Sequence, residues 1–269
     1  MQPHEQATRS RRAAGGTVRR LLADTPRILS RARAAPKTLV FLDFDGTLTP
    51  LRRRPEQVHL APRSRALLGR LARHPRLAVF IVSGRPLADL KRHVRLPGVR
   101  CLGVHGWEGL PGARLDLASR RALHRALVQA RRDLLPIPGI RLQNKGVAFA
   151  IHYRAARPAA VRRARRRLFD LLRPFQSELR SMAGKKIWEV LPRAHGGKGT
   201  AVKKLLAGFP RGSLAIYMGD DTTDEAAFRA LPAGITVRVG NPRSTHAGWR
   251  ARNPAEVLRF LKILETELG

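Results

Sequence analysis

The sequence predicts an α/β fold, with a three-layer, Rossmann-like core around a parallel sheet and an α+β cap domain inserted into that core. Short apolar segments alternate with helical patterns at both ends of the chain, which is typical of βαβ units. After Trp107 this alternation is interrupted by a different pattern of helices and paired strands. Carboxylates follow two of the apolar segments directly, at the ends of strands where ligands bind in open α/β sheets.

The first part of the core is expected to begin with a strand at 38–42. These residues are apolar, partly β-branched and followed by Gly and Pro, a pattern typical of a buried strand that ends in a turn. The next segments predict, in order, a helix at 62–73, a strand at 77–82, a helix at 86–93 and a strand at 100–104. A helix between successive strands favours parallel pairing.

The segment between residues 107 and 191 predicts the inserted cap. Turns are indicated at 144–146 and 184–186, each between two short apolar stretches, so these stretches should form hairpin-like pairs. The expected order is helix, strand, strand, helix, strand, strand, at 117–135, 140–143, 147–153, 158–172, 179–182 and 187–191.

Alternation of helices and strands resumes after the cap. The expected elements are a helix at 199–207, a strand that ends at Met218, a helix at 225–230, a strand at 235–239 and a helix at 255–268. The sequence therefore predicts a core domain at 37–106 and 192–269, a cap at 107–191 and a basic N-terminal extension at 1–36.

Composition favours a cytoplasmic protein. The 269 residues contain one cysteine, Cys101, which excludes an intramolecular disulfide and suits a reducing compartment. No apolar run reaches the roughly 18 residues of a membrane span. Residues 1–37 are basic but lack the apolar segment of about 7–15 residues found in secretory signals, so we expect a frayed extension or a surface helix there.

The charge is strongly positive, with 53 Lys and Arg against 19 Asp and Glu and a formal net charge of +34. Such a balance raises the hypothesis of a nucleic-acid or anionic-surface binder. The arginines are scattered over most expected helices, however, and aromatic residues for base stacking make up only 5% of the chain. We expect nonspecific polyanion binding at low salt, no specific nucleic-acid or membrane partner, and a monomer.

Two carboxylates end the first expected strand. Asp43 and Asp45 are two residues apart, so on a strand they would point the same way and repel each other unless a cation neutralises them. A divalent metal ion, and a reaction that uses one carboxylate as nucleophile and the other as acid and base, would explain the pair. An N-cap or Asx-turn is the structural alternative, but it needs only one aspartate.

A second acidic group follows the strand that ends at Met218. Asp224 and Glu225 stand in an expected first helical turn, where acids are favoured by the helix dipole, so these two alone could be capping residues. Asp220 and Asp221 come earlier, at the carboxyl end of the strand, where ligands bind.

Two further segments have the chemistry of phosphate binding. Ser83, Gly84 and Arg85 follow an expected strand, and a hydroxyl with exposed N–H groups there suits a phosphate oxygen. Lys198 opens an expected helix after glycines and could place a point charge on a phosphate. Each is weak alone, because Ser-Gly turns are common and lysine is mostly exposed.

Together these pieces resemble the haloacid dehalogenase superfamily of phosphotransferases across nearly the whole core. The order that carries the resemblance is Asp-x-Asp after the first strand, Ser83 after the second, Lys198 before a later helix, and Gly-Asp-Asp-x-x-Asp at 219–224. The inserted segment resembles the type IIB α/β cap of that superfamily.

Finer motifs are similar to the trehalose-6-phosphate phosphatase family. They include Asp43–Pro50, Gly103–Glu108, Lys145, His152-Tyr153-Arg154, Lys186–Val190 and Gly219–Glu225. The sequence departs from this family at two places. Gln143 and Asn144 stand where an acid is expected near the lysine, and Leu191 stands where the family has an arginine. Both departures lie in the cap or at its junction, and they bear on sugar recognition.

The resemblance implies a Mg²⁺-dependent phosphatase that hydrolyses trehalose 6-phosphate to trehalose and phosphate through an aspartyl-phosphate. Asp43 would be the nucleophile and Asp45 the acid and base, and Ser83 and Lys198 would contact the phosphoryl group. The expected metal ligands are the Asp43 carboxylate, the Asp45 backbone carbonyl and Asp220, with Asp221 or Asp224 in support. The expected substrate-binding residues are Thr47, Gly84, Arg85, His105, Glu108, Lys145, His152, Arg154 and Glu189.

Alternatives stay open at this point. His152 and Arg154 could form an ordinary polar sheet face, Glu189 could pair with a surface arginine, and Lys145 could be a solvated turn residue. The substrate could be another sugar phosphate, such as sucrose 6-phosphate or mannosyl-3-phosphoglycerate. A member of a different class would be a catalytically silent polyanion-binding protein.

Overall fold

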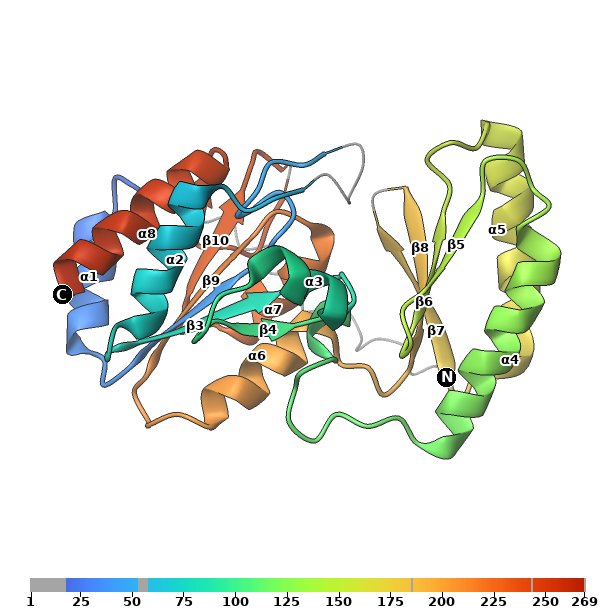
Figure 1. Cartoon of the computed structure of the whole chain (residues 1–269), viewed down its shortest axis with the longest axis horizontal. Helices are drawn as coiled ribbons and strands as arrows, with labels where there is room; N and C mark the ends of the chain where they lie inside the picture. Colours follow the sequence, from blue (N-terminus) through green and yellow to red (C-terminus); the bar gives the residue numbers. More distant parts are fainter. Residues whose placement is uncertain (1–17, 53–57, 185, 243, 269) are drawn as a thin grey trace, which may run out of the picture.

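The computed structural model describes residues 18–52, 58–184, 186–242 and 244–268. These residues form a larger core and a smaller cap that lie side by side (Figure 1). The helices and strands of the cap lie at 117–192, between elements of the core, so the cap is an insertion between two halves of the core. The predicted fold class is confirmed.

The core sheet has seven described strands, all of them parallel to their neighbours. β2 lies near the middle, between β9 and β3, and Leu42 at its end is in register with Met218 and Ile81. The strand order is β1-β11-β10-β9-β2-β3-β4, with bounds Arg19–Arg20, Trp249–Ala251, Ile235–Val239, Leu214–Gly219, Thr38–Leu42, Leu77–Val82 and Arg100–Leu102.

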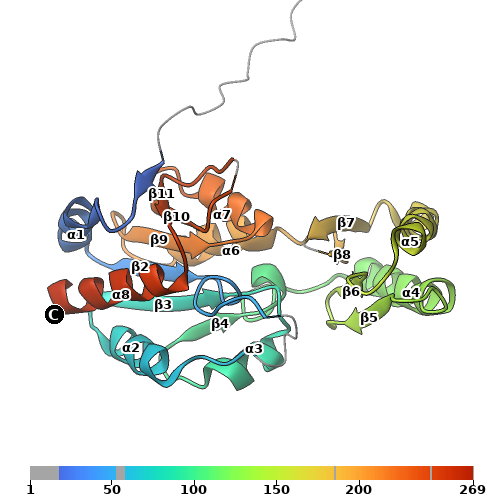
Figure 2. The ribbon, with the colours of Figure 1, turned by 90° about the horizontal axis from the view of Figure 1, so that it is seen from above.

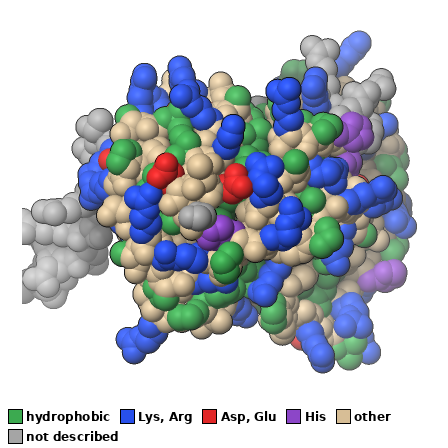
Figure 3. Space-filling model, turned by 60° about the vertical axis from the view of Figure 1, so that its left-hand side comes forward, with side chains coloured by type: hydrophobic (Ala, Val, Ile, Leu, Met, Phe, Trp, Pro, Cys, Tyr) green, Lys and Arg blue, Asp and Glu red, His purple; other side chains and the backbone are tan. Residues whose placement is uncertain are grey.

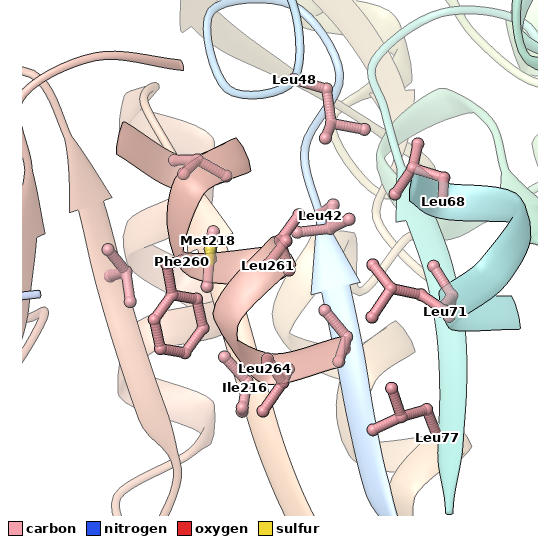
Figure 4. Packing of buried hydrophobic residues seen from close by; sticks show 14 of the residues in the cluster. Leu42, Leu48, Leu68, Leu71, Leu77, Ile216, Met218, Phe260, Leu261 and Leu264 are labelled. Atoms are coloured by element: carbon pink, nitrogen blue, oxygen red, sulfur yellow. The ribbon is translucent and has the colours of Figure 1, made fainter. Parts of the chain in front are cut away.

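Helices cover both faces of this sheet because its central strands are apolar on both sides. Val40 and Leu42 of β2 pack with residues of α1, α2, α3 and α8, whereas Leu39 and Phe41 pack with residues of α6 and α7. Figure 4 shows the first of these clusters, in which leucines of α2 and α8 lie against β2, β3 and β9. The bounds are Thr25–Ala34, Pro62–Arg73, Leu87–Val94 and Pro254–Leu268 for α1, α2, α3 and α8, and Gly197–Ala207 and Glu225–Ala230 for α6 and α7.

The cap is a four-stranded antiparallel sheet whose outer face is covered by two helices (Figures 1 and 2). Phe149, Ile151, Trp188 and Val190 pack with the helices in an apolar cluster of their own. The alternate positions of the same strands therefore face the core. The cap elements are α4 (Leu117–Leu134), β5 (Arg141–Asn144), β6 (Phe149–His152), α5 (Pro158–Leu172), β7 (Leu179–Gly184) and β8 (Ile187–Pro192).

The segment before the cap differs from its predicted form. The strand expected at 100–104 ends at Leu102, and a short 3₁₀ turn, η2, occupies Val104–Gly106. Val104 and His105 have φ values of 43° and 54°, which residues with a side chain rarely adopt. The turn is held by paired hydrogen bonds between the backbones of Gly103 and Glu108. The sequence contains no signal for this conformation.

The region predicted as a basic extension at 1–36 is described from residue 18 onward. β1 pairs with β11 at one edge of the core sheet, and α1 contacts α8. Ile28 and Leu29 of α1 are buried in the main apolar cluster. Residues 18–36 therefore pack as part of the core, and residues 1–17 lie outside the described residues.

The excess positive charge is spread over the surface. In Figure 3, Lys and Arg side chains are scattered over the visible face and acidic side chains are sparse. Within the described ranges, no helix combines the length and the apolar character that a membrane crossing requires.

Candidate active site

Three neighbouring strands bring predicted site residues to one edge of the core sheet. β2 pairs with β3 on one side and with β9 on the other. Asp43, Ser83 and Asp220 each follow the last residue of one of these strands. Because parallel strands place their carboxyl ends together, residues far apart in sequence meet here.

A tight turn after β2 allows the two acidic loops to approach each other. Gly46 has a φ of 93°, and its N–H donates to the carbonyl of Thr49 at 2.7 Å. A Cβ at Gly46 would lie 2.2 Å from the Asp220 carboxylate, which excludes any side chain there. Thr47 is fully buried and its hydroxyl donates to Asp220 Oδ1 at 3.3 Å. Gly46 and Thr47 thus fix where Asp220 lies.

Lys198 connects the two acidic loops. Its Nζ donates to Asp43 Oδ1 at 2.6 Å and to Asp224 Oδ1 at 2.7 Å, and the side chain is only 2% exposed. Lys198 stands in the first turn of α6, which packs against α7. Removing one partner from a buried ion pair costs about 3–5 kcal/mol, so these three groups depend on one another.

Asp224 is buried and is held by several hydrogen bonds from neighbouring residues. It is 0% exposed and, besides Lys198, accepts from the Tyr217 hydroxyl at 2.7 Å and from the Asp221 N–H at 2.8 Å. A Cβ at Gly219 would lie 2.2 Å from the Asp224 carboxylate. The glycine before Asp220 is therefore required for Asp224 to pack beneath the strand end.

The buried carboxylates at this edge of the sheet lie close together, and this shifts their pKa values. Burial raises the pKa of Asp43 well above its usual value, Lys198 opposes this shift, and Asp224 and Asp220 add to it. Burial, followed by the charge of Asp224, raises the pKa of Asp220 to about 6. Burial alone would lower the pKa of Lys198, but Asp224 and Asp43 together raise it well above its usual value. Lys198 therefore stays protonated, and its single positive charge does not balance the negative charges that the three carboxylates can carry.

The residues present fit a divalent metal ion. Asp43, Asp220 and Asp224 each offer a carboxylate oxygen, and these oxygens lie within 4.8 Å of one another. Carboxylate oxygens are the ligands that Mg²⁺ prefers, and two more positive charges would balance this site. Asp221 is not among these three residues, and its side chain accepts from the Asp224 backbone N–H in a capping box at the start of η4 (Thr222–Asp224).

Asp45 lies apart from the other carboxylates and is held by Arg85. The guanidinium donates to both Asp45 oxygens at 2.7 Å, and it also donates to Asp89 Oδ2 at 3.0 Å. Bidentate pairing of this kind fixes orientation as well as charge. The Ser83 Oγ is buried nearby and accepts from the Arg85 backbone N–H at 3.2 Å.

A second buried ionic group joins the cap to the core. Glu189 of β8 contacts the imidazole Nε2 of His105 in the core with one oxygen and the Lys145 Nζ with the other. Lys145, in the turn between β5 and β6, also donates to the Gly84 carbonyl at 2.7 Å. Burial would raise the pKa of Glu189, but His105 and Lys145 outweigh burial and lower it. The Glu189 carboxylate is therefore ionised and paired across the domain junction.

A cleft of about 850 Å³ lies beside this junction. His152 and Arg154 line it from the cap, opposite Arg85 from the core. The His152 Nε2 lies 3.0 Å from Gln143 Oε1, and burial, followed by the charge of Lys145, lowers the pKa of His152. The lining is rich in cations and suits an anionic ligand; its basic members are Arg52, Arg85, Arg92, Arg141, His152, Arg154 and Lys186.

Glu108 and the two departures in the cap have local roles in the structure. Glu108 Oε2 accepts from the Leu87 N–H at 2.6 Å, at the start of α3. Asn144 Oδ1 accepts from the Gly146 N–H at 2.9 Å and so stabilises the turn after β5. Leu191 is fully buried against Val104 of the core in a small apolar cluster. At the position where the resembling family has an arginine, this chain makes an apolar contact between cap and core.

Three contributors were not predicted from the sequence. Tyr217 holds Asp224, Asp89 holds Arg85, and His195 is buried between the two domains. Tyr217 could have been found, because a tyrosine within an apolar central strand needs a hydrogen-bond partner for its hydroxyl. His195 and Asp89 carry no comparable signal, since a histidine in a glycine-containing loop and an acid in the first turn of a helix are both ordinary.

Comparisons with known proteins agree with this geometry. A family model described as trehalose-phosphatase matches residues 41–248. The chain is 34% identical over 262 residues to the trehalose-phosphate phosphatase of Mycobacterium tuberculosis (strain ATCC 25618 / H37Rv), a match that covers 89% of this chain. The chain spans 64% of the length of that relative.

Solved structures show the same fold. The C-terminal domain of a C. albicans trehalose-6-phosphate phosphatase has a TM-score of 0.77 at 24% identity and covers 93% of this chain and 99% of that one. An Aspergillus fumigatus trehalose-6-phosphate phosphatase has a TM-score of 0.67 at 30% identity, with coverage of 93% and 99%. The fold, the order of the site residues and the family model all agree. The chain belongs to the trehalose-phosphatase family, within the haloacid dehalogenase superfamily.

Proposed function

We propose that this chain is a Mg²⁺-dependent phosphatase that hydrolyses trehalose 6-phosphate to trehalose and phosphate. One observation carries the proposal: a fully buried lysine joins Asp43 to Asp224 beside a third carboxylate, Asp220. Such an arrangement suits phosphoryl transfer, in which the main task is to position the phosphoryl group and stabilise its charge.

In the proposed reaction, Asp43 attacks phosphorus in line while the bond between phosphorus and the sugar oxygen breaks. Asp45 donates a proton to the departing sugar oxygen. Water then attacks the aspartyl-phosphate, Asp45 accepts a proton from that water, and phosphate leaves with Asp43 restored. Arg85 orients Asp45 by donating to both of its oxygens, which suits the step in which Asp45 accepts a proton. For the first step Asp45 must carry a proton taken from solvent and leave this pairing with Arg85.

The expected ligands of the metal are the Asp43 carboxylate, the Asp45 backbone carbonyl and Asp220. Of the two candidates for support, Asp224 is favoured over Asp221, because its carboxylate belongs to the close group of three. When bound, Mg²⁺ supplies positive charge that stabilises the transferring phosphoryl group.

The phosphoryl group is expected to contact residues at the ends of the central strands. Lys198 provides a charge, and Ser83 and Thr47 provide hydroxyls next to the carboxylates. Gly84 provides backbone without a side chain, and Arg85 lines the cleft that opens toward the cap.

The sugar is expected to bind between cap and core. His105, Glu189 and Lys145 form the contact between the domains, and the buried His105 Nδ1 has no hydrogen-bond partner among the described residues, which leaves it for a ligand hydroxyl. Arg154 and His152 line the adjoining cleft, and Glu108 lies behind it at the start of α3.

Phosphate release from a panel of substrates tests the function. We expect turnover of trehalose 6-phosphate well above that of sucrose 6-phosphate, mannosyl-3-phosphoglycerate and p-nitrophenyl phosphate. Faster turnover of another sugar phosphate would reassign the substrate but keep the reaction. No turnover of any phosphate ester, with the protein folded and Mg²⁺ present, would favour the catalytically silent polyanion-binding protein.

Arg154 provides a test of the cap's role in recognition. Its replacement, Arg154→Ala, should raise KM for trehalose 6-phosphate about tenfold and leave the kinetics on p-nitrophenyl phosphate within about twofold, because a small substrate does not reach the cap. Arg163→Ala, an exposed arginine of α5, is the matched control and should change neither. Equal losses on both substrates would argue against a sugar-binding role for Arg154.

We further propose that the protein works as a cytoplasmic monomer, with the cap at 107–191 and the core at 37–106 and 192–269, to which residues 18–36 add. The presence of one cysteine supports a reducing compartment. The separate apolar clusters of core and cap support the division into domains.

A further inference from the structure

His195 is a buried histidine in an otherwise exposed loop. It lies between the end of β8 at Pro192 and the start of α6 at Gly197, where the chain returns from the cap to the core. Its neighbours Ala194 and Gly196 are exposed, whereas the His195 side chain is 2% exposed. Burying one polar ring in a surface loop requires that its two nitrogens find partners.

The hydrogen bonds of His195 determine its tautomer. The Gly197 N–H donates to Nδ1 at 3.1 Å, so Nδ1 carries no proton. Nε2 lies 2.8 Å from the Val104 carbonyl oxygen, which can only accept, so Nε2 is the protonated nitrogen. Burial lowers the pKa of His195 to about 4 and keeps the ring neutral; the hydrogen bond to Val104 opposes this shift and the charge of His105 adds to it. A neutral imidazole is thus a rigid bridge between a donor and an acceptor.

The two partners of this bridge lead to different parts of the site. Gly197 precedes Lys198, which contacts Asp43. Val104 precedes His105, which contacts Glu189 of the cap. His195 therefore spans the distance between the phosphoryl side of the site and the contact with the cap.

The conformation of Val104 needs support from surrounding residues, and His195 supplies part of that support. A β-branched residue with a φ of 43° is strained by about 1–3 kcal/mol and needs its surroundings to hold it there. The His195 ring also stacks on Trp107, at 5.1 Å between centroids and 17° between planes. Trp107 lies in the segment that runs from the core toward the cap, and His195 lies in the segment that returns, so His195 contacts both segments that connect the domains.

We propose that His195 is a positioning residue that sets the relative placement of Lys198 and His105. It touches neither of the acidic loops and acts through its two backbone partners. The proposal deepens the proposed phosphatase function and rests on it. The chemistry at Asp43 requires Lys198 in place, and recognition of a sugar under the cap requires His105 in place.

Two amide variants separate the two halves of this role. In His195→Asn, the amide oxygen can take the place of Nδ1 and accept from the Gly197 N–H, but the bond to Val104 is lost. In His195→Gln, the longer side chain brings its amide nitrogen to the place of Nε2, where it can donate to the Val104 carbonyl, but the bond to Gly197 is lost. His195→Asn should therefore raise KM for trehalose 6-phosphate about tenfold or more, with a much smaller loss on p-nitrophenyl phosphate. His195→Gln should lower kcat about tenfold or more on both substrates and change KM little.

His124→Ala, an exposed histidine of α4, is the control and should leave both substrates within about twofold of the parent protein. If the His195 variants have a lower melting temperature but the same KM and the same kcat per folded molecule as the parent protein, the proposal is wrong. Equal effects of the Asn and Gln variants on KM and kcat would also overturn it.

The tautomer of His195 can be measured by NMR without any assay of activity, so this test does not depend on the proposed function. In ¹⁵N spectra of the whole chain, His195 should show an unprotonated Nδ1 and a protonated Nε2 throughout pH 5.5 to 8. A ring that titrates with a normal pKa or has the opposite tautomer would refute the bridge. If the parent protein turns over p-nitrophenyl phosphate but not trehalose 6-phosphate, the assigned substrate fails, while the kcat test of His195→Gln still applies.

Discussion

Two buried ionic groups define this protein, and their charge balance is opposite. At the edge of the core sheet, one lysine stands among three carboxylates, Asp43, Asp220 and Asp224. At the junction of cap and core, one carboxylate, Glu189, stands between two basic side chains, His105 and Lys145. The pKa of Asp220 is raised to about 6, whereas the pKa of Glu189 is lowered.

This difference in charge balance gives the two groups different roles. The core group has too many negative charges for the one cation that it contains, so it can accept a divalent ion without further rearrangement. The charge of Glu189 in the junction group is paired by His105 and Lys145, so this group can hold the cap against the core without a metal ion.

Asp43→Asn should abolish phosphatase activity, with a loss of at least about a thousandfold on every substrate, because the amide cannot act as the nucleophile. The measurement is steady-state phosphate release, with circular dichroism to show that the fold is retained. Retained turnover by a folded variant would contradict the role of the core group.

Activity should disappear in EDTA and return with Mg²⁺. Asp220→Asn should raise the Mg²⁺ concentration for half-maximal activity by more than about a hundredfold, and Asp221→Asn, which keeps a capping side chain, by less than about tenfold. Calorimetric titration of Mg²⁺ into both variants measures binding directly. Full activity in metal-free buffer would refute the metal requirement, and equal effects of the two variants would refute the assignment of the ligand.

Glu189→Gln should destabilise the fold by about 3 kcal/mol at pH 7, because Lys145 and His105 lose their counter-charge. The folded pKa of Glu189 lies below its usual 4.5, so its stabilising effect is present above that pH and is lost as the pH falls further. The difference in melting temperature between the parent protein and Glu189→Gln should therefore be large at pH 7 and should shrink progressively as the pH falls below about 4.5 toward the lower folded pKa.

Glu267→Gln provides the control, because Glu267 forms an exposed ion pair with Arg33. This variant should change stability by less than about 1 kcal/mol at any pH. If the difference in melting temperature between the parent protein and Glu189→Gln does not depend on pH, the junction is held by packing, such as that of Leu191, and not by charge.

Tyr217→Phe should have the smallest effect. It removes one hydrogen bond to Asp224, worth about 1.5 kcal/mol, while Lys198 and the Asp221 N–H still hold that carboxylate. We expect a loss in kcat of up to about tenfold and a modest fall in melting temperature. The other tyrosine of the chain, Tyr153, stacks on Trp188 in the cap, and Tyr153→Phe should leave kcat unchanged.

The structure places most of the predicted core residues together because their positions follow from strand ends. Asp43, Ser83 and Asp220 end three apolar segments, and any parallel pairing of those segments brings them to one edge. The partners of these residues could not be predicted. Arg85 pairs with Asp45, and Glu189 pairs with His105 and Lys145, through contacts between distant segments that no local pattern records.

Hydrophobic periodicity and strand length are local properties, so the alternation of strands and helices, the inserted cap and the carboxylates at the strand ends could be predicted from the sequence. Other features arise only in the folded chain: the left-handed turn at Val104 and His105, the burial of His195 between the two connecting segments, and the pairing of Glu189 across the junction. Each of these depends on burial among distant residues, which overrides local preference and supplies the partners that an exposed chain would find in water.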